Sequence, residues 1–530
     1  MNVDLLIQNG TILDGTGAPP FRGDVAVRNG QIVGVGDATE KNAKSVIDAT
    51  GLVVAPGFID IHSHSDFTLV VDPRAVSSVT QGVTFELVGN CGHGCAPIGD
   101  PDLTRSNIYG CRSDHEIPWR TVAEYLDVLQ QRQPAVNVAT LVPNGNLRLA
   151  AAGLVERSSN ATELRQMKKM LAQGLEEGAF GYSTGLEYSP ERDCSEDEIV
   201  ELCGVAAQAG GMYATHTRNR SGEAQETIDE AIRTAAAADV PLQISHIGVV
   251  ARLSDNGQLA VQQAIRQVQD ARSAGLDVGF DMHTRLFGTT NLSAALPGWA
   301  LEGDRADIAA RLRSPSTRSE MKSHESIITA ISGGDWNRIV VFDCHAQPEW
   351  SQCSIAEIAD QRGIEPFDAI YDLLLAEIDR LHELMVLALT YREEELQMAF
   401  DDPDCMVGSD ATALATDGPL AGTAFHGAFT WAGWFFRHFV RDRKLLTPQE
   451  AVRRFTSLPA RRLGLSQRGT IREGACADLA IFDADQFAER GTMFQPNQVA
   501  VGMRYVVVNG VMTIEDGRLT GLRGGQVLRR

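Results

Sequence analysis

The sequence predicts an α/β fold: a TIM-like (β/α)8 barrel joined to a β-sandwich domain that both chain ends build. Three observations support this fold class. From residue 57 to residue 463, apolar strand candidates alternate with amphipathic helical stretches such as ATELRQMKKMLAQGLEEG. Such repeated strand–helix units are typical of a parallel barrel. Both chain ends instead show short alternating strands with Asn-Gly turns, and one gap between barrel strands is long enough for an insertion.

The β-domain is expected to combine residues 1–56 with residues 464–530. The first part contains DLLIQNGTILDG, DVAVRNGQIVGVG and KSVIDATGLVVAPG, and the second repeats the pattern in MRYVVVNGVMTIEDG. A few short strands rarely form a stable sheet by themselves. We therefore expect the two parts to pair in one composite domain.

The barrel is expected to occupy residues 57–463, and its eight strand candidates follow in a regular order. They are GFIDIH, GVTFELVGNC, VNVATLVPN, AFGYST, MYATH, PLQISH, DVGFDMH and CMVGSD. The stretch between the seventh and eighth candidates is much longer than one helix needs. We therefore predict an inserted subdomain at approximately residues 286–345, before the last barrel strand.

The composition argues against several classes of function. The chain of 530 residues carries 47 Lys and Arg against 69 Asp and Glu, a formal net charge of −22. This surplus of acid argues against nucleic acid or an anionic membrane surface as a partner. The sequence has no stretch of about 20 apolar residues to span a bilayer and no signal-peptide pattern at its start. The nine cysteines show no disulfide-like spacing, so we expect reduced thiols in the cytoplasm.

Residues able to bind a metal end five of the eight predicted strands. The first strand ends in His62 and His64, the second in Cys91, the fifth in His216, the sixth in His246 and the eighth in Asp410. In a barrel all these positions lie on the C-terminal rim, where active sites of this fold form. Any one of them alone is more often structural, but their coincidence at strand ends predicts a metal centre.

The residue types favour zinc, because imidazole and thiolate suit this ion and a catalytic site leaves one position open to water. Cys91 lies in GNCGHGCAPI, where a strand breaks into a glycine-rich loop, which favours a ligand over a buried apolar thiol. We interpret the nearby His93, Cys95 and Cys111 as bystanders. Asp410 is the predicted catalytic residue, because a carboxylate beside metal-bound water can accept its proton and return it to a departing nitrogen.

These motifs resemble the N-acyl-D-amino-acid deacylases, the D-aminoacylase family of the amidohydrolase superfamily. The similarity rests on PGFIDIHSHSD, GVTFELVGNCG, GAFGYSTGLEYSP, ATHTRN, LQISHIG and MVGSD, which follow in the family's order, and on the closing LPARRLGLSQRGTIREGACADLAIFD. It spans essentially the whole chain. The resemblance implies a small-molecule substrate and hydrolysis of a C–N bond other than a peptide bond by metal-activated water.

The resemblance also implies how the metal is held. One tight zinc ion would be held by Cys91, His216 and His246, and a second, weaker position would use His62, His64 and Asp410. Many superfamily relatives bridge two metals with a carboxylated lysine, but this chain has no lysine near a predicted strand end. Cys91 is therefore the expected bridge.

The segments expected to contact substrate depart from the family pattern. PNGNLR has Asn144 where the family has a histidine, SHIG has Gly248 in place of a lysine, and residues 422–424 replace a His-Pro-Arg segment. DMHTR places His283 and Arg285 where tyrosines are expected. The predicted substrate contacts are Asn144, Tyr188, His283 and Arg285.

These departures predict the kind of substrate. The missing lysine and arginine are the cations with which the family would hold a substrate carboxylate, and a buried unpaired carboxylate is costly. The segment AFHGAFTWAGWFF offers aromatic rings instead, although such a stripe is usually core packing. A neutral or aromatic N-acyl compound is therefore the first hypothesis.

Three alternatives stay open at this point. Arg285 could supply the displaced cation and so preserve an N-acyl-D-amino-acid deacylase. A carbamate or a urea carries a carbonyl that zinc-bound hydroxide attacks in the same way. A catalytically inactive barrel scaffold would be expected to lose metal ligands first, whereas all six predicted ligands are present. The sequence also leaves open whether the chain forms a homo-oligomer.

Overall fold

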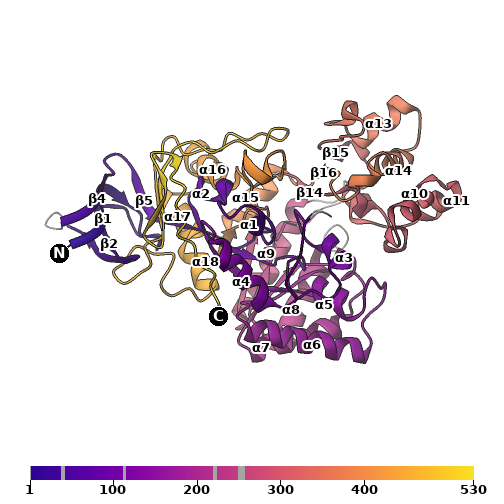
Figure 1. Cartoon of the computed structure of the whole chain (residues 1–530), viewed down its shortest axis with the longest axis horizontal. Helices are drawn as coiled ribbons and strands as arrows, with labels where there is room; N and C mark the ends of the chain where they lie inside the picture. The colour runs from indigo at the N-terminus through magenta and orange to yellow at the C-terminus, as the bar shows by residue number, and fades with distance from the viewer. Residues whose placement is uncertain (1, 38–41, 112–114, 219–223, 249–256) are drawn as a thin grey trace.

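A barrel of eight parallel strands lies between a β-domain and an inserted subdomain (Figure 1). The computed structural model describes residues 2–37, 42–111, 115–218, 224–248 and 257–530. The barrel strands are β6 (Phe58–Asp60), β7 (Val83–Val88), β8 (Asn137–Thr140) with β9 (Val142–Pro143), β10 (Gly181–Gly185), β11 (Met212–His216), β12 (Leu242–Ile244), β13 (Val278–Met282) and β17 (Cys405–Val407).

Hydrogen bonds close the barrel between its first and last strands. Strands β6, β7 and β8 form one parallel ladder, and β9 to β13 with β17 form another. Only Leu141 separates β8 from β9, so the two act as one interrupted strand. At the remaining edge Ser63 pairs with Ala411, and the His64 amide donates to the Ala411 carbonyl at 2.8 Å. The predicted (β/α)8 barrel is confirmed.

Amphipathic helices cover the outside of the barrel. In α6 (Ala161–Glu176), Met167, Leu171 and Leu175 recur at intervals of four residues and are buried, because this spacing places them on one face. Asn160 begins this helix as the first residue of a capping box. The other main helices of this layer are α4 (Val122–Arg132), α5 (Asn144–Ala151), α7 (Glu196–Gln208), α8 (Ala224–Ala238), α9 (Gly257–Ser273), α15 (Glu393–Asp401), α17 (Pro448–Phe455) and α18 (Ser457–Arg462).

Both chain ends build the β-domain, where indigo and yellow strands lie together in Figure 1. Its nine strands are β1 (Asn2–Ile12), β2 (Phe21–Arg28), β3 (Gln31–Gly36), β4 (Asn42–Asp48), β5 (Val53–Pro56), β18 (Leu479–Phe482), β19 (Met503–Val508), β20 (Val511–Glu515) and β21 (Arg518–Leu519). The halves join where β5 and β18 run antiparallel, with Val54 opposite Ile481. Side chains from both ends share one core, including Ile7, Val27 and Leu479, as predicted for the composite sandwich.

The last residues of the chain leave this sheet. Val527 pairs with Val138 of β8, and Leu528 packs against the core inside the barrel. The expected range 464–530 had placed this tail wholly in the β-domain. Its pairing partner lies almost 400 positions away in the chain, so local patterning could not reveal the contact.

The segment between β13 and β17 folds as a subdomain with its own core. An antiparallel sheet of β14 (Gly288–Asn291), β16 (Met385–Ala388) and β15 (Ile339–Val341) packs with α10 (Arg305–Arg313), α11 (Pro315–Met321), α12 (Ile327–Ser332), α13 (Ile355–Arg362) and α14 (Pro366–Ala376). Because β16 is the middle strand, the unit extends to Ala388. The expected range 286–345 therefore covers only its first part. Among the described helices of the whole chain, none is long and apolar enough to cross a membrane.

Candidate metal centre and active site

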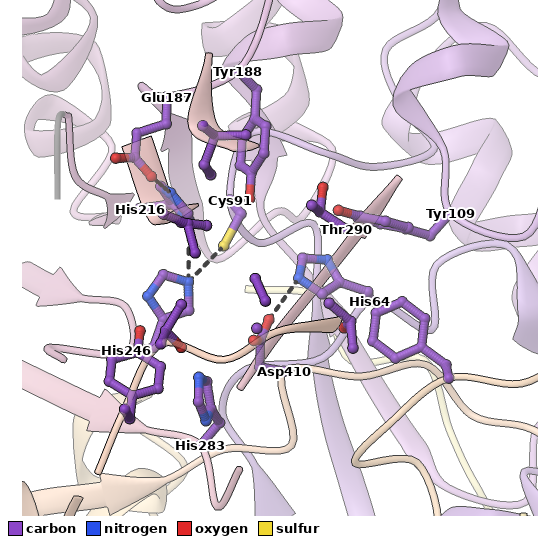
Figure 2. A pocket seen from close by; sticks show the side chains of 18 residues that line it. His64, Cys91, Tyr109, Glu187, Tyr188, His216, His246, His283, Thr290 and Asp410 are labelled. Atoms are coloured by element: carbon purple, nitrogen blue, oxygen red, sulfur yellow. Dashed lines mark hydrogen bonds and ion pairs between the residues drawn. The ribbon is translucent and has the colours of Figure 1, made fainter. Parts of the chain in front are cut away.

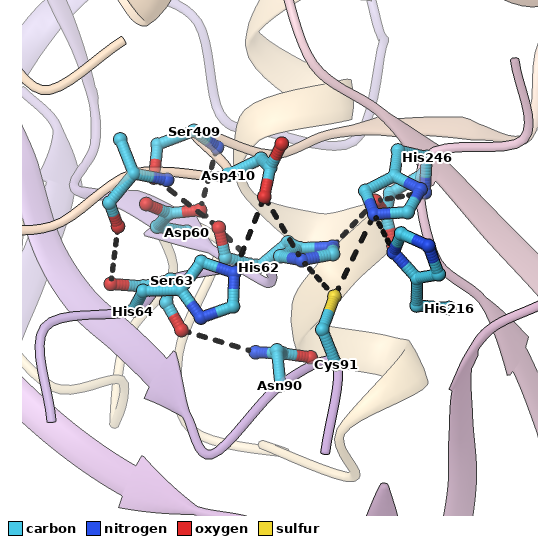
Figure 3. Close-up of polar contacts among 12 residues, drawn as sticks. Asp60, His62, Ser63, His64, Asn90, Cys91, His216, His246, Ser409 and Asp410 are labelled. Atoms are coloured by element: carbon cyan, nitrogen blue, oxygen red, sulfur yellow. Dashed lines mark hydrogen bonds and ion pairs between the residues drawn. The ribbon is translucent and has the colours of Figure 1, made fainter. Parts of the chain in front are cut away.

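Six side chains from five barrel strands meet at the C-terminal rim (Figure 3). His62 and His64 follow β6, Cys91 follows β7, His216 ends β11, His246 follows β12 and Asp410 follows β17. Their donor atoms form three overlapping groups, each with all its atoms within 4.8 Å of one another. The structure therefore brings together all six residues that the sequence singled out as metal ligands.

The Cys91 thiol is the centre of this cluster. Its Sγ atom lies 3.2 Å from Nε2 of His62 and 3.6 Å from Nε2 of His246. Nδ1 of His216 lies 3.1 Å from the same His246 nitrogen. Cys91 thus faces both predicted half-sites, which is the position that a bridging ligand requires.

Asp410 turns its two carboxylate oxygens in different directions. Oδ1 lies 3.3 Å from Nε2 of His64 and 3.5 Å from Nε2 of His62. Oδ2 accepts a hydrogen bond from Nη2 of Arg285 at 2.7 Å. One oxygen therefore faces the metal donors and the other faces a buried cation.

The backbone is strained where three of these side chains enter the site. Cys91, His246 and Asp410 have φ angles of 53°, 36° and 45°, a left-handed conformation that non-glycine residues rarely adopt. Such strain persists only when the surrounding structure compensates for it, and it is concentrated at functional sites.

Two carboxylates orient the imidazole rings. Asp281 binds Nδ1 of His62 at 3.0 Å and accepts the backbone amide of His246 at 2.9 Å. Glu187 binds Nε2 of His216 at 2.8 Å. Metal-ligating histidines typically give their second nitrogen to such a partner. His62 is thereby left to face the cluster through Nε2, and His216 through Nδ1.

The charges of these buried groups depend on one another. Burial raises the pKa of the Cys91 thiol, but the charge of His62 and hydrogen bonds from His216 and His246 hold this pKa well below its usual value. Burial lowers the pKa of His64, yet its hydrogen bond with Asp410 raises it to about 9. Burial also disfavours ionised Asp410, but His64 and the charge of Arg285 keep its pKa well below the usual range. The cluster thus has the electrostatics of a cation site.

This donor set fits a divalent metal ion such as zinc. Cys91, His216 and His246 offer one sulfur and two nitrogens, a combination typical of that ion. All three are buried, and a buried ionised thiol is costly unless a cation compensates for it. The predicted second set, His62, His64 and Asp410, offers two nitrogens and one oxygen, and Oδ1 of Asp410 lies within 3.5 Å of Nε2 of both histidines. The donor geometry groups His62 and His64 with Cys91, and Asp410 with His62 and His246.

A cavity opens above the donors (Figure 2). Its lining includes the donors Cys91, His246 and Asp410 and the rings of Tyr109, Tyr188, Tyr391 and Phe425. The inserted subdomain completes the wall with Thr290 of β14, Ile327 and Ile331 of α12, and Ala388 of β16. Among the described residues that line this cavity, none is lysine or arginine.

The structure separates the four predicted substrate contacts into two pairs. Tyr188 and His283 line the cavity. Asn144 lies outside the lining and donates to Glu191 at 3.0 Å. Arg285 also lies outside it, because its guanidinium is turned toward Asp410 and three backbone carbonyls. A buried asparagine and a buried arginine both need local partners, and nearby carboxylate and carbonyl oxygens provide them.

Several cavity residues were missed by sequence reasoning. Tyr109 comes from the long loop after β7, and Tyr391 and Ile331 belong to the segment around the insertion. Glu187 could have been predicted from the sequence, because it directly precedes the predicted substrate contact Tyr188 in GLEYSP. Of the six rings in AFHGAFTWAGWFF, only Phe425 lines the cavity, and Trp431 and Phe435 are among those that pack in the core.

A barrel whose rim gathers imidazoles, a thiolate and a carboxylate around one cavity defines the class of metal-dependent hydrolases built on this fold. A model of the amidohydrolase family matches residues 45–328 and 395–514. The chain belongs to the amidohydrolase family and is a metal-dependent enzyme that acts on carbon–nitrogen bonds. The unmatched residues 329–394 fall largely within the inserted subdomain.

Individual relatives are similar along their whole length. An N-acyl-D-glutamate deacylase of Alcaligenes xylosoxydans xylosoxydans is 32% identical, with 100% of this chain and 97% of that protein covered. A D-aminoacylase of the same organism is 30% identical, with 99% and 98% covered.

Solved structures agree with this placement. A crystal structure of D-aminoacylase superposes with a TM-score of 0.82 at 29% identity and covers 100% of both chains. An N-acyl-D-glutamate deacylase from Bordetella bronchiseptica, complexed with zinc and a phosphonate that mimics the tetrahedral intermediate, gives a TM-score of 0.82 at 30% identity with the same coverage. The predicted resemblance to the D-aminoacylases is confirmed.

Proposed function

We propose that this chain is a zinc-dependent hydrolase that cleaves the amide bond of a small neutral or aromatic N-acyl compound. The observation that carries the proposal is the cavity above the donors. Its described lining offers rings, aliphatic side chains, threonine hydroxyls and the Glu187 carboxylate, but no lysine or arginine. A substrate carboxylate buried against such walls would have no opposite charge to compensate its lost hydration.

Cys91, His216 and His246 would hold the zinc ion. When bound, zinc supplies an activated water and polarises the substrate carbonyl. Asp410 accepts the proton of the attacking water at Oδ1, the oxygen that faces His64 and the metal donors. The same carboxyl group then returns the proton to the departing nitrogen, which completes hydrolysis without a second acid.

The site of the missing lysine supports a neutral substrate. A side-chain carbon added at Gly248 would lie 2.6 Å from Cε1 of Tyr391 and 2.7 Å from Cε of Met282. The Tyr391 ring thus fills the space through which a side chain at position 248 would have to pass. Arg285 could replace that lysine only by giving up its contacts with Asp410.

An N-acyl-D-amino acid is the second candidate substrate. It is favoured by the names of the relatives, which include an N-acyl-D-glutamate deacylase and a D-aminoacylase similar over the whole chain. The two candidates differ in one chemical group, the carboxylate beside the amide nitrogen. They can therefore be separated with matched compounds.

The deciding experiment measures kcat/KM of the zinc-loaded protein for an N-acyl anilide and for N-acyl-D-amino acids. We expect the neutral anilide to be preferred by about tenfold or more, since each unpaired buried charge costs binding. A preference of similar size for the N-acyl-D-amino acid would establish the second candidate instead. Hydrolysis of neither compound would refute both.

We further propose that the enzyme works in the cytoplasm. None of the nine cysteines, all of which the structure describes, forms a disulfide, and six of them, including Cys91, Cys203 and Cys405, are buried. Free buried thiols are typical of proteins in reducing compartments. Formation of a homo-oligomer stays a prediction.

A further inference from the structure

Arg285 differs from the predicted family pattern, and its guanidinium binds Asp410 and two backbone carbonyls beside it. Nη2 donates to Oδ2 of Asp410 at 2.7 Å and to the Asp410 carbonyl at 2.9 Å. Nη1 donates to the carbonyls of Ser409 at 2.8 Å and His426 at 2.6 Å. The residue is 5% exposed. These contacts hold both the side chain and the strained backbone of Asp410.

The space for this guanidinium is built into the chain. Gly427 has a φ of 94°, and a side-chain carbon at this position would lie 2.1 Å from Nη1 of Arg285. The glycine therefore satisfies two requirements, a left-handed backbone and close approach of a charged group. Arg285 sits in this cradle, outside the lining of the cavity.

The arrangement changes the charge of the second donor group. Asp410 lies 3.3 Å from His64 and 3.5 Å from His62. These histidines are neutral when they bind a metal, so Asp410 is the only anion among the three predicted ligands of the second site. Arg285 compensates that charge at 2.7 Å. Cys91 faces both sites, but an ion held by Cys91, His216 and His246 would already compensate the thiolate charge. A second dication would then meet a carboxylate that is neutralised by Arg285, and it is attracted to a neutral site far less than to a negative one.

We propose that Arg285 is a positioning residue that reserves Asp410 for proton transfer and prevents tight binding of a second metal ion at His62, His64 and Asp410. Arg285 holds Oδ2, so only Oδ1 points toward the donors and the water to be activated. Its charge repels a second cation from the same carboxylate. The inference rests on the proposed hydrolysis, but its metal-binding consequence is independent of turnover.

The test compares Arg285→Ala with Arg454→Ala. Arg454 is a matched control because it is also buried and also donates to one carboxylate, of Glu450, and to one backbone carbonyl. It lies on α17, away from the cavity. Competition with a chelator, followed by metal analysis, reports the affinity for a first and a second zinc equivalent.

For Arg285→Ala we expect the first zinc to bind as in the parent and the second to bind about tenfold more tightly or better, since a nearby positive charge is removed. Arg454→Ala should change neither affinity. A purely structural role of Arg285 would instead weaken or leave unchanged the second site. Either of those results overturns the proposal, whatever the substrate proves to be.

In assays with the hydrolysed substrate, Arg285→Ala with one zinc should lose about 100-fold in kcat with little change in KM, because orientation of the base is lost. Added guanidinium ion should restore part of kcat. A large rise in KM with unchanged kcat would show that Arg285 binds substrate and would refute the positioning role. If Arg285→Ala does not fold, Gly427→Ala and Arg285→Lys replace it. Each variant disturbs the hydrogen bonds of the Arg285 guanidinium while a positive charge remains at position 285. A kcat equal to that of the parent in both variants would also refute the proposal.

Discussion

The Glu187 carboxylate binds Nε2 of His216 at 2.8 Å, while Nδ1 of the same ring lies 3.1 Å from Nε2 of His246. The ring therefore presents Nδ1 to the predicted metal ligands. Glu187 also lines the cavity. Glu187, the residue before the predicted substrate contact Tyr188, thus determines which ring nitrogen of His216 faces the metal site.

Substitution of this carboxylate should weaken metal binding. In Glu187→Gln the amide oxygen can still accept a hydrogen bond, but the negative charge that favours donation from Nε2 is lost. We expect zinc affinity to fall about 10- to 100-fold, the usual effect of removing such a partner. Chelator competition measures this, with Glu450→Gln as a control on α17. Unchanged affinity would mean that Glu187 serves the cavity and not the metal.

Loss of a predicted tight ligand should have a larger effect. Cys91→Ala, His216→Ala and His246→Ala should each lose most bound zinc and turnover, by more than the about 100-fold seen for outer partners. Metal analysis after dialysis and kcat measurement check this. Cys203→Ala is the control, since Cys203 is a free, buried thiol on α7. Full zinc and normal rates in Cys91→Ala would refute the ligand assignment.

Asp410→Asn should separate metal binding from catalysis. The amide cannot accept the proton of water, and removal of a general base costs about 100- to 10,000-fold in rate. Zinc binding by Cys91, His216 and His246 should remain, so the variant should keep its metal content while its kcat falls. A rate within about tenfold of the parent would assign proton transfer to another group, and His283, which also lines the cavity, would be the first to examine.

The contact between Gly248 and Tyr391 predicts a change in substrate preference. In Gly248→Ala the added methyl group would meet Tyr391 at 2.6 Å, so kcat/KM for a neutral amide should fall about tenfold as the ring shifts. Tyr391→Ala should remove most of this penalty in the double variant, which a double-mutant cycle detects.

The same pair offers a gain-of-function test. Gly248→Lys combined with Tyr391→Ala places a cation where the resembled family has one and clears its path. We expect kcat/KM for an N-acyl-D-amino acid to rise relative to the neutral amide, because the substrate carboxylate gains a partner. No relative change would indicate that position 248 does not face the carboxylate site.

Much of the fold could be predicted because its rules are local. The apolar strands, the helices between them and the Asn-Gly turns each depend on residues close together in the chain. The convergence of His62, Cys91, His216, His246 and Asp410 was also predictable, because in a parallel barrel every strand delivers its last residue to the same rim. Topology alone thus determined which residues would meet.

Only the tertiary structure decided what surrounds them. The extent of the insertion to Ala388 depends on β16 pairing with β14 and β15, strands far away in sequence. Arg285 was a candidate for substrate until its guanidinium proved to face Asp410, 125 positions further along the chain. Side-chain direction at the rim depends on backbone carbonyls, on the space beside Gly427 and on neighbouring charges, which belong to separate strands. The residue spacing within one segment cannot predict such contacts.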